Sequence, residues 1–530
     1  MSVVIGNLIK NSCRIQCLNI SENSNIENGL IHIITKLERS HDTLREIDLT
    51  NCNLNKSMCK LIIDTLRNFS TLENVYLGEN TNIGMHFSDI CKGLKTSCKT
   101  LITISLYNCG LCGEYGEELK NLFTLCPQIQ QINIGHNDTI ANENLKLFKG
   151  LQCSSYTLKI IRITEFKLDE DASNHLGNLL LDCHHIEELD LEGNTNMRKG
   201  FFAICNGLQN SCSKLKFLYL EECNLNENMG LSLAQLLVNC TQLQACQLKS
   251  NKDLVEAIIS ICGGLETSSD TLKTLDFADC NLDENSSISL GNLLLKCSTV
   301  EKVHLNCNRN MGRQGFSSIC KGLVKSSTSL KGLYFDECCI DEFLCICIGD
   351  LLTKCSKIEK TYFRSNPSMI NGVYIIFKEL YAFRANLTAI DFENCNITKY
   401  VAFYIGDFLS KSTRICTIFI GLNRDMGDGF FQICKGLENS VHTLKNIGFQ
   451  NCKLNENMCK SVGKLLTKCS KIEKLYIGWN SDIGRGWRDI CRGLERSSKN
   501  LQIFDIRHSL LDSHSCQTIS RHFGKDIARV

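Results

Sequence analysis

The densest group of reactive side chains in the sequence is a set of cysteines between residues 338 and 347. Cys338 and Cys339 are adjacent, and Cys345 and Cys347 follow shortly after them. Thiolates can bind zinc, but a structural zinc site needs four well-placed ligands, and the histidines of the chain are scattered. The adjacent His184–His185 pair falls between an expected helix and an expected strand, which favours a solvated loop. We therefore predict core and loop thiols here, with no metal and no cofactor.

Sequence signatures of enzymes are absent from the chain. It contains no H-E-x-x-H motif, no G-x-S-x-G motif and no paired C-x-x-C motifs. The phosphate-binding pattern G-x-x-x-x-G-K-[ST] is missing too, because Gly463–Lys464 falls inside an expected helix and lacks the upstream glycine. The sequence therefore predicts a protein that is not an enzyme.

Aromatic residues that could bind a partner recur at a regular interval. Tyr362 and Tyr476 are 114 residues apart, which is twice 57. The same 57-residue period separates Leu44 from Leu101 and continues to Leu501, with a single interval of 58. A sister motif with the same period runs from Ile15 to Ile472. A fixed period of this length indicates a solenoid, which typically offers an extended surface to other proteins.

Each period holds two units of 28 and 29 residues, and we count 18 units in all. Leu44-x-x-Ile47-x-Leu49 predicts a short strand with two apolar side chains on one face. An Asn or a Cys follows at the turn, where the backbone needs a buried hydrogen-bond partner. A helix comes next, and in the longer unit it carries a recurring Ile-Cys-x-Gly-Leu, whose small residues indicate close approach to the neighbouring helix.

Helices are wider than the spacing of parallel strands, so the helices must fan out on the outside. The predicted fold is a right-handed α/β horseshoe, a leucine-rich-repeat solenoid with a parallel inner sheet and outer helices. We predict a single domain over residues 1–530. Residues 1–13 form the partial helix of a truncated unit, residues 15–500 the alternating units, and residues 501–530 the last unit and C-terminal end.

The alternation of 28- and 29-residue units, with Cys in one turn and Asn in the other, resembles the ribonuclease-inhibitor class of leucine-rich repeats. The Ile-Cys-x-Gly-Leu helix followed by Ser-Cys-x-x-Leu, at 90–101 and 204–215, is similar to the repeat arms of NLR-type (NACHT) innate immune sensors. The resemblance covers residues 3–523 and implies a cytosolic, reduced, protein-binding protein. It does not supply individual binding residues. NLR sensors carry a nucleotide-binding module before the repeats, and this sequence has none.

Motif positions three, five, seven and eight should face the concave side of the strands. Between residues 186 and 394 these positions hold eleven acidic side chains and only four basic ones, Lys249, Lys302, Lys360 and Arg364. Ordinary exposed strands also carry polar residues and tyrosine, so this pattern has a bland interpretation. The sharper hypothesis is a groove in which acidic residues steer a basic partner and aromatic residues anchor it. The candidate protein-binding residues are Tyr76, Asp190, Glu192, Tyr219, Glu221, Glu222, Asp276, Asp279, Tyr334, Asp336, Glu337, Tyr362, Asp391, Glu393, Phe419, Tyr476 and Trp479.

The overall composition restricts the classes of partner and the cellular compartment that we expect. The net charge of +1 argues against strong attraction to nucleic acid or membranes, and no stretch approaches 18 apolar residues. At least 19 of the 34 cysteines occupy repeat slots, about 10 Å from their slot partners, which is too far for a disulfide. With no signal peptide at the start, we expect reduced thiols and a cytoplasmic protein.

The ends of the sequence resemble the interior of the repeat. Residues 3–9 are similar to the helix at 289–294, and residues 516–523 are expected to form the last helix with no strand after it. Solenoids normally need capping units. Either partners cover these ends, which includes end-to-end self-association, or the chain is a piece of something longer.

The leading functional prediction is a non-catalytic scaffold that binds a basic protein through its concave face, such as a ribonuclease-inhibitor-like blocker. The alternative is a ligand-sensing or regulatory arm of an NLR-like immune receptor. A minor alternative is a regulator resembling the Ran GTPase activator, which would need a functional arginine on a rim loop. Arg162, Arg364 and Arg507 fall instead at strand positions that face the concave side, and the acidic tail of that family is missing.

Overall fold

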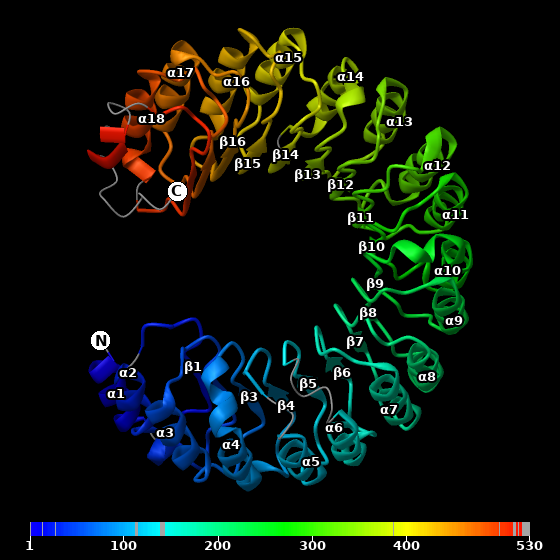
Figure 1. The fold of residues 1–530 in the computed structure, drawn as a ribbon, viewed down its shortest axis with the longest axis vertical. Coiled ribbons are helices and arrows are strands. Elements are labelled where there is room, and N and C mark those ends of the chain that lie inside the picture. Colours follow the sequence, from blue (N-terminus) through cyan, green and yellow to red (C-terminus); the bar gives the residue numbers. More distant parts are fainter. Residues whose placement is uncertain are drawn as a thin grey trace. The chain divides into compact units, whose positions relative to one another are not determined.

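The computed structural model describes residues 2–12, 14–26, 28–111, 115–137, 144–384, 386–497, 499–511, 516–517 and 519–521. The chain forms two compact units, unit 1 over Met1–Leu272 and unit 2 over Lys273–Val530. In each unit three-residue strands line one side, the strand side, and helices line the other, the helix side (Figure 1). Both units show the repeated strand, turn and helix of a leucine-rich-repeat α/β solenoid, so the predicted fold class is confirmed.

Consecutive strands within unit 1 pair in parallel and in register. The strands of unit 1 are β1 (Cys17–Asn19), β2 (Glu46–Asp48), β3 (Asn74–Tyr76), β4 (Thr103–Ser105), β5 (Gln131–Asn133), β6 (Ile160–Arg162), β7 (Glu188–Asp190), β8 (Phe217–Tyr219) and β9 (Ala245–Gln247). Its α-helices are α1 (Ser2–Asn11), α2 (Asn28–Ile34), α3 (Lys56–Leu66), α4 (Phe87–Leu94), α5 (Gly116–Thr124), α6 (Asn144–Leu151), α7 (Glu170–Leu181), α8 (Gly200–Gly207), α9 (Glu227–Leu237) and α10 (Ile258–Leu265).

Unit 2 repeats this arrangement, again with consecutive strands parallel. Its strands are β10 (Thr274–Asp276), β11 (Lys302–His304), β12 (Gly332–Tyr334), β13 (Lys360–Tyr362), β14 (Ala389–Asp391), β15 (Thr417–Phe419), β16 (Asn446–Gly448), β17 (Lys474–Tyr476) and β18 (Ile503–Asp505). Its α-helices are α11 (Glu284–Leu294), α12 (Gly312–Leu323), α13 (Glu342–Leu352), α14 (Gly372–Leu380), α15 (Lys399–Leu409), α16 (Gly429–Leu437), α17 (Glu456–Leu466) and α18 (Gly486–Leu494).

The turn asparagines from Asn80 to Asn480 are buried and satisfy the backbone, as predicted. The side-chain oxygen of Asn423 accepts hydrogen bonds from the amides of Cys395 (3.1 Å) and Ile397 (2.9 Å). Its amide group donates to the carbonyls of Phe392 and Ile420 at 2.8 and 2.9 Å. Asn194 makes the same set of bonds in unit 1. Each asparagine therefore ties one repeat to the preceding one through groups that would otherwise be buried without partners.

The turn cysteines of the shorter unit are buried thiols. Cys395 donates to the carbonyl oxygen of Phe363 at 3.0 Å, and Cys223 makes the same contact with Leu191 at 3.1 Å. Burial is the main cause that raises the pKa of the thiols of Cys52, Cys109, Cys223, Cys338, Cys395 and Cys452, which keeps these groups neutral. They behave as small apolar residues, as the repeat pattern predicts.

The helices begin and pack as their sequences predict. Asn226 and Asn455 cap α9 and α17, and Asp283 forms a capping box at the start of α11. The glycine of Ile-Cys-x-Gly-Leu marks close contact between helices. A Cβ on Gly436 would lie 2.4 Å from the carbonyl oxygen of Gly406, so only glycine fits there.

The predictions about the two ends of the chain and about the number of domains have different outcomes. A helix, α1, lies where the partial N-terminal helix is expected. The expected last helix over 516–523 lies partly outside the described residues. The single-domain assignment stays a prediction.

Candidate protein-binding site

The strand side of unit 2 carries a row of side chains at motif position five, at the end of each strand. On β14 to β18 this row reads Asp391, Phe419, Gly448, Tyr476 and Asp505, and neighbouring members are paired in the sheet. Position five points away from the core, so the row lies on the open face.

Gly448 makes a gap in the middle of this row. A Cβ at Gly448 would lie 2.5 Å from the Cδ1 atom of Phe419, so the Phe419 ring occupies the space that a side chain would take. Phe419 and Tyr476, two strands apart, meet edge to face with ring centroids 5.9 Å apart. The gap and the two rings together form an apolar floor.

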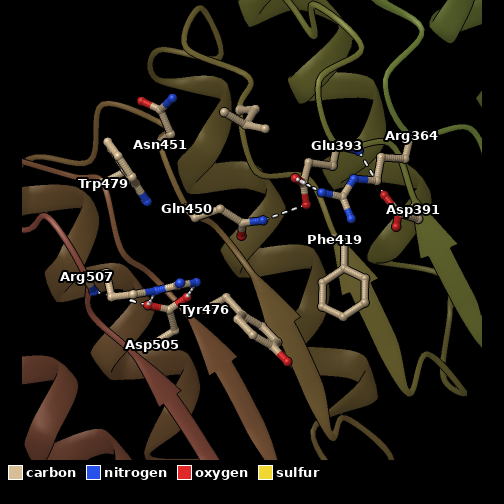
Figure 2. Close-up of a pocket in the computed structure, with 11 residues that line it drawn as sticks. Arg364, Asp391, Glu393, Phe419, Gln450, Asn451, Tyr476, Trp479, Asp505 and Arg507 are labelled. Carbon is tan, nitrogen blue, oxygen red and sulfur yellow. Dashed lines mark hydrogen bonds and ion pairs between the residues drawn. The ribbon is translucent and has the colours of Figure 1, made fainter. Parts of the chain in front are cut away.

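This floor belongs to a hollow of about 640 Å³ on unit 2 (Figure 2). Five residues of the predicted site line it, namely Asp391, Glu393, Phe419, Tyr476 and Trp479. The structure adds Arg364, Leu422, Gln450, Asn451, Asp505 and Arg507.

Two arginine–carboxylate pairs border the hollow. The Arg364 guanidinium lies 3.1 Å from Glu393 Oε1, and Gln450 donates to the other oxygen of the same carboxylate. Arg507 holds Asp505 through two bonds, Nε to Oδ1 at 2.9 Å and Nη2 to Oδ2 at 2.7 Å (Figure 2). This pairing lowers the pKa of Asp505. Both pairs hold their carboxylates in fixed positions.

Asp391 is a carboxylate of the hollow with a strongly raised pKa. Burial, the chief cause, and the nearby Asp336 and Glu393 carboxylates raise its pKa to about 7, against a smaller opposing effect of Arg364. Its Oδ1 accepts a hydrogen bond from the Glu393 amide at 3.0 Å. A cation that enters the hollow would therefore favour the ionised form of Asp391.

The rim of the hollow consists of Leu422 and Trp479, which occupy motif position eight of successive longer units. Both have left-handed backbones, with φ of 59° and 61°. That conformation costs about 1–2 kcal/mol for a residue with a Cβ, and the repeat imposes it whichever side chain is present. The Trp479 side chain is 53% exposed and stacks on His508 with centroids 3.8 Å apart. Trp479 is therefore a large, oriented and accessible apolar surface.

A second aromatic row lies on β11 to β13 of unit 2. His304 stacks on Tyr334 at 4.0 Å between centroids, and Tyr334 stacks on Tyr362 at 5.2 Å. Asp336 follows β12, and its Oδ1 accepts from the Arg364 amide at 2.7 Å. Tyr334, Asp336 and Tyr362 belong to the predicted set, and they lie on unit 2 outside the lining of the hollow.

Unit 1 carries a smaller hollow of about 310 Å³ that includes Asp190 and Glu192 from the predicted set. Tyr107, Asn133, His136, Arg162, Thr164 and Glu165 complete its lining. Burial is the main cause that raises the pKa of Asp190 to about 6. Tyr219 lies on the next strand, and Tyr76 lies further away on β3.

The remaining predicted acidic residues are distributed along both units. Glu222 faces Lys249 at 3.6 Å, and Glu337 faces Arg309 at 2.5 Å. Glu221 is buried, and Asp276 accepts from the amide of Ala278 at 2.9 Å. Asp279 is half-buried and lies in the turn after β10.

The count of acidic residues in the sequence therefore overstates the free negative charge of the strand side. Glu188, Glu222, Glu337 and Glu393 each face a basic side chain within the chain. The residues that sequence reasoning left out of the site, such as Gln450 and Asp505, occupy the same motif positions beyond residue 394. Extending those positions to the last unit would have found them.

The three concave arginines considered for a GTPase regulator all hold carboxylates. Arg162 pairs with Glu188 at 2.6 Å, and Arg364 and Arg507 form the pairs described above. Throughout the part of the chain that the structure describes, no group of three or more His, Cys, Asp or Glu side chains is placed to hold a metal ion. Within the same residues, no helix has both the length and the apolar character needed to cross a membrane.

Curated relatives share this repeat architecture along most of the chain. Ribonuclease inhibitor of Mus musculus is 23% identical over 407 residues, which cover 76% of this chain and 89% of that protein. The chain is a leucine-rich repeat protein similar to ribonuclease inhibitor. The leucine-rich repeat protein is also 20% identical over 396 residues to NACHT, LRR and PYD domains-containing protein 5 of Homo sapiens, which cover 75% of this chain and 33% of that protein. It therefore spans about a third of the length of that NACHT relative.

No family model matches the leucine-rich repeat protein. Among solved structures, the crystal structure of the Rad7 and Elc1 complex in yeast aligns with a TM-score of 0.45 and 15% identity, covering 79% of this chain and 87% of that chain. That likeness is too remote to bear on function. The relatives support a protein-interaction scaffold as the general class.

Proposed function

We propose that the leucine-rich repeat protein is a non-catalytic scaffold that binds a basic segment of a protein partner in the hollow of unit 2. The observation that carries this proposal is the convergence of Phe419, Tyr476 and Trp479 with Asp391 around one cavity. Aromatic anchors beside desolvated charges are typical of residues that contribute most of the binding energy.

A lysine or arginine side chain of the partner is the group that fits best. The Tyr476 and Trp479 rings would contact neighbouring residues of the partner, and the aliphatic stem of the basic side chain would pack over the Phe419 floor beside Asp391. Asp391 would accept its hydrogen bonds. Arg364 and Arg507 would remain paired with Glu393 and Asp505. When Asp391 is ionised, the hollow therefore holds one more carboxylate than guanidinium.

In its more specific form, the proposal is that the chain blocks a basic ribonuclease, as the name of the mouse relative suggests for that protein. The test is inhibition and direct binding of a basic pancreatic-type ribonuclease at about 50 mM and about 300 mM salt, since exposed charges are screened more strongly at the higher concentration. We expect binding that weakens with salt. Binding that is equally strong at both concentrations would contradict an electrostatically steered basic partner.

Absence of ribonuclease binding would leave the broader scaffold proposal to be tested with other basic proteins. Histone H1 and cytochrome c are suitable probes because both are basic and neither is a nuclease. If none of the three binds at the lower salt concentration, the hollow is not a site for basic partners.

A second candidate function is the ligand-sensing or regulatory arm of an NLR-like receptor. The alignment to a third of a NACHT, LRR and PYD protein favours it. An antibody against the repeats, used on a denaturing gel of native cells, separates the two. A band near 59.6 kDa supports the free-standing binder, and a much larger band supports the receptor arm.

A further inference from the structure

The helix side of unit 2 exposes a group of aromatic and aliphatic side chains on three successive helices. We call Phe343, Ile346, Tyr374, Tyr400, Phe403 and Tyr404 the outer aromatic patch. Apart from the half-buried Tyr374, its members are between 40% and 83% exposed. They lie on α13, α14 and α15, on the side of the unit away from the hollow (Figure 1). Exposed apolar groups gathered on neighbouring helices often mark an interaction surface.

The repeats themselves show that the fold does not require these residues. Phe343 and Tyr400 are each the second residue after the N-cap of their helix. The same position in the other capped helices of the shorter unit is polar in every case, at Ser57, Asp171, Asn228, Asn285 and Asn457. Five sister helices therefore fold with small polar side chains where α13 and α15 expose aromatic rings.

The middle helix of the patch also departs from the repeat. Glu379 of α14 stands where α16 has Gly436, one period later. A Cβ added to Gly349 of α13 would meet Ile375 of α14 at 3.0 Å, whereas one added to Gly406 of α15 would meet Gln432 of α16 at 2.5 Å. Helix α14 therefore packs less closely on α13 than α16 packs on α15.

Tyr374 of this looser helix contacts Tyr404 of α15. Their rings meet edge to face with centroids 4.3 Å apart, and their hydroxyl oxygens are 3.2 Å apart. The contact makes the aromatic surface continuous from α14 to α15.

The charged groups around the patch are paired within the chain. Lys399 lies 2.7 Å from Asp428, and Lys411 lies 3.0 Å from Asp407. On the α13 side, Arg313 lies 2.6 Å from Asp341 and its guanidinium faces the Phe343 ring at 5.4 Å. These three pairs carry no net charge, so they would not repel an identical surface.

The chemistry of the patch is self-complementary. A tyrosine hydroxyl both donates and accepts hydrogen bonds, so Tyr400 and Tyr404 can pair with the same residues of a second copy. Two-fold dimers bring one patch against itself in this way. With about 200 Å² for a fully exposed aromatic side chain, the patch offers roughly 500 Å² per copy, or about 1,000 Å² for two copies, which is the lower limit for a specific interface.

We propose that the outer aromatic patch is the interface of a weak two-fold dimer of this chain. The dimer leaves the hollow of unit 2 free, and it is independent of the proposed function. It also differs from end-to-end association, because it uses the side of the solenoid.

Sedimentation velocity of the full chain from about 1 µM to about 100 µM tests the proposal, because a small interface is expected to have micromolar affinity. We expect the mass to rise from 59.6 kDa towards twice that value over this range. The double variant Phe343→Asn and Tyr400→Asn should raise the dimer dissociation constant at least tenfold. This variant should fold, since asparagine is the residue found at this position in three sister helices.

The matched control is Leu231→Ser with Ile259→Ser, which removes two exposed apolar side chains from the helix side of unit 1. It should dimerise like the unchanged protein. A monomer throughout the range, or a dimer that survives the asparagine substitutions, overturns the proposal. Equal loss of dimer in the control variant also overturns it, because the effect would then not be specific to the patch.

Discussion

The two hollows of this protein occupy equivalent places in their units, and the rows of side chains at motif position five differ between them. The position-five row of β4 to β8 reads Ser105, Asn133, Arg162, Asp190 and Tyr219, and it corresponds repeat by repeat to the row of β14 to β18. Gly448 in unit 2 stands where unit 1 has Arg162.

Arg162 fills the middle of the unit 1 row and holds Glu188 at 2.6 Å. The hollow there measures about 310 Å³, against about 640 Å³ for the hollow of unit 2. The same backbone thus carries a charged, partly filled surface in one unit and an open aromatic cavity in the other. The glycine at this strand position leaves its space to the Phe419 ring, which lines the hollow of unit 2.

The largest effect on binding is expected when Gly448 of unit 2 is replaced by arginine, the residue that unit 1 has at the equivalent position. In Gly448→Arg the new Cβ would overlap the Phe419 ring, and the guanidinium would occupy the hollow and add a positive charge. We expect affinity for the basic partner to fall at least about 100-fold, which corresponds to the loss of several hot-spot contacts. Isothermal titration calorimetry measures the effect. Unchanged dimerisation of this variant would show that the chain remains folded, and unchanged affinity would refute the role of the hollow.

Removing the aromatic anchors should have the next largest effect. Trp479→Ala and Tyr476→Ala should each weaken binding about 30-fold, since each loses a large oriented contact surface. Tyr156→Ala is the matched control, because Tyr156 is an exposed tyrosine of unit 1 outside both hollows. An equal loss in the control would show that the effect does not come from the hollow.

The pH dependence tests the role of Asp391. Because its pKa is raised to about 7, the carboxylate becomes ionised between pH 6 and pH 8. Affinity for a basic partner should therefore increase about tenfold over this interval, and Asp391→Asn should remove the increase. The charged groups that face Asp391 are Asp336, Glu393 and Arg364, and they are unchanged in this variant.

Ionisation of Asp391 should change the stability of the fold in the opposite direction to the affinity for the partner. The folded chain holds the Asp391 proton more tightly than the unfolded chain does, so the free energy of unfolding should fall as pH rises towards 7. Chemical denaturation at pH 6 and pH 8 measures it, and Asp391→Asn should reduce this pH dependence. A steeper dependence in the variant would contradict the assignment.

The smallest effect on binding is expected from the reciprocal change, Arg162→Gly. It should leave affinity within about twofold, because Arg162 does not line the hollow of unit 2, where we propose that the partner binds. Stability should fall by about 1–3 kcal/mol, since the mostly buried Glu188 carboxylate loses its partner. Thermal unfolding and calorimetry of the same preparation measure both quantities. A large loss of affinity would place the binding surface in unit 1 instead.

The sequence predicted the scaffold in detail because each repeat solves the same local problem. Two apolar residues at alternate positions define the strand, and an asparagine such as Asn423 provides the five hydrogen bonds that the turn needs. The cap at Asn226 and the glycine at Gly436 follow from the same local rules. These features depend on contacts between one repeat and the next. The repeat period of the sequence therefore predicts where they occur.

The candidate site could be predicted only in part. Position in the repeat was enough to place Asp391, Phe419 and Tyr476 on the open face. It could not show that the Phe419 ring lies in the space left by Gly448 and meets Tyr476, because that depends on the side chains of neighbouring strands.

The sequence by itself determined the strands, turns and helices and which side chains face outward. The tertiary structure decided which of those side chains meet. Pairs such as Arg364–Glu393 join residues 29 apart along the chain, and the pairing reduces the negative charge that a count of residues suggests. Burial by several strands likewise sets the pKa of Asp391. The period fixes local geometry because each repeat contacts its immediate neighbours, whereas the charge and shape of the surface depend on side chains that vary from one repeat to the next.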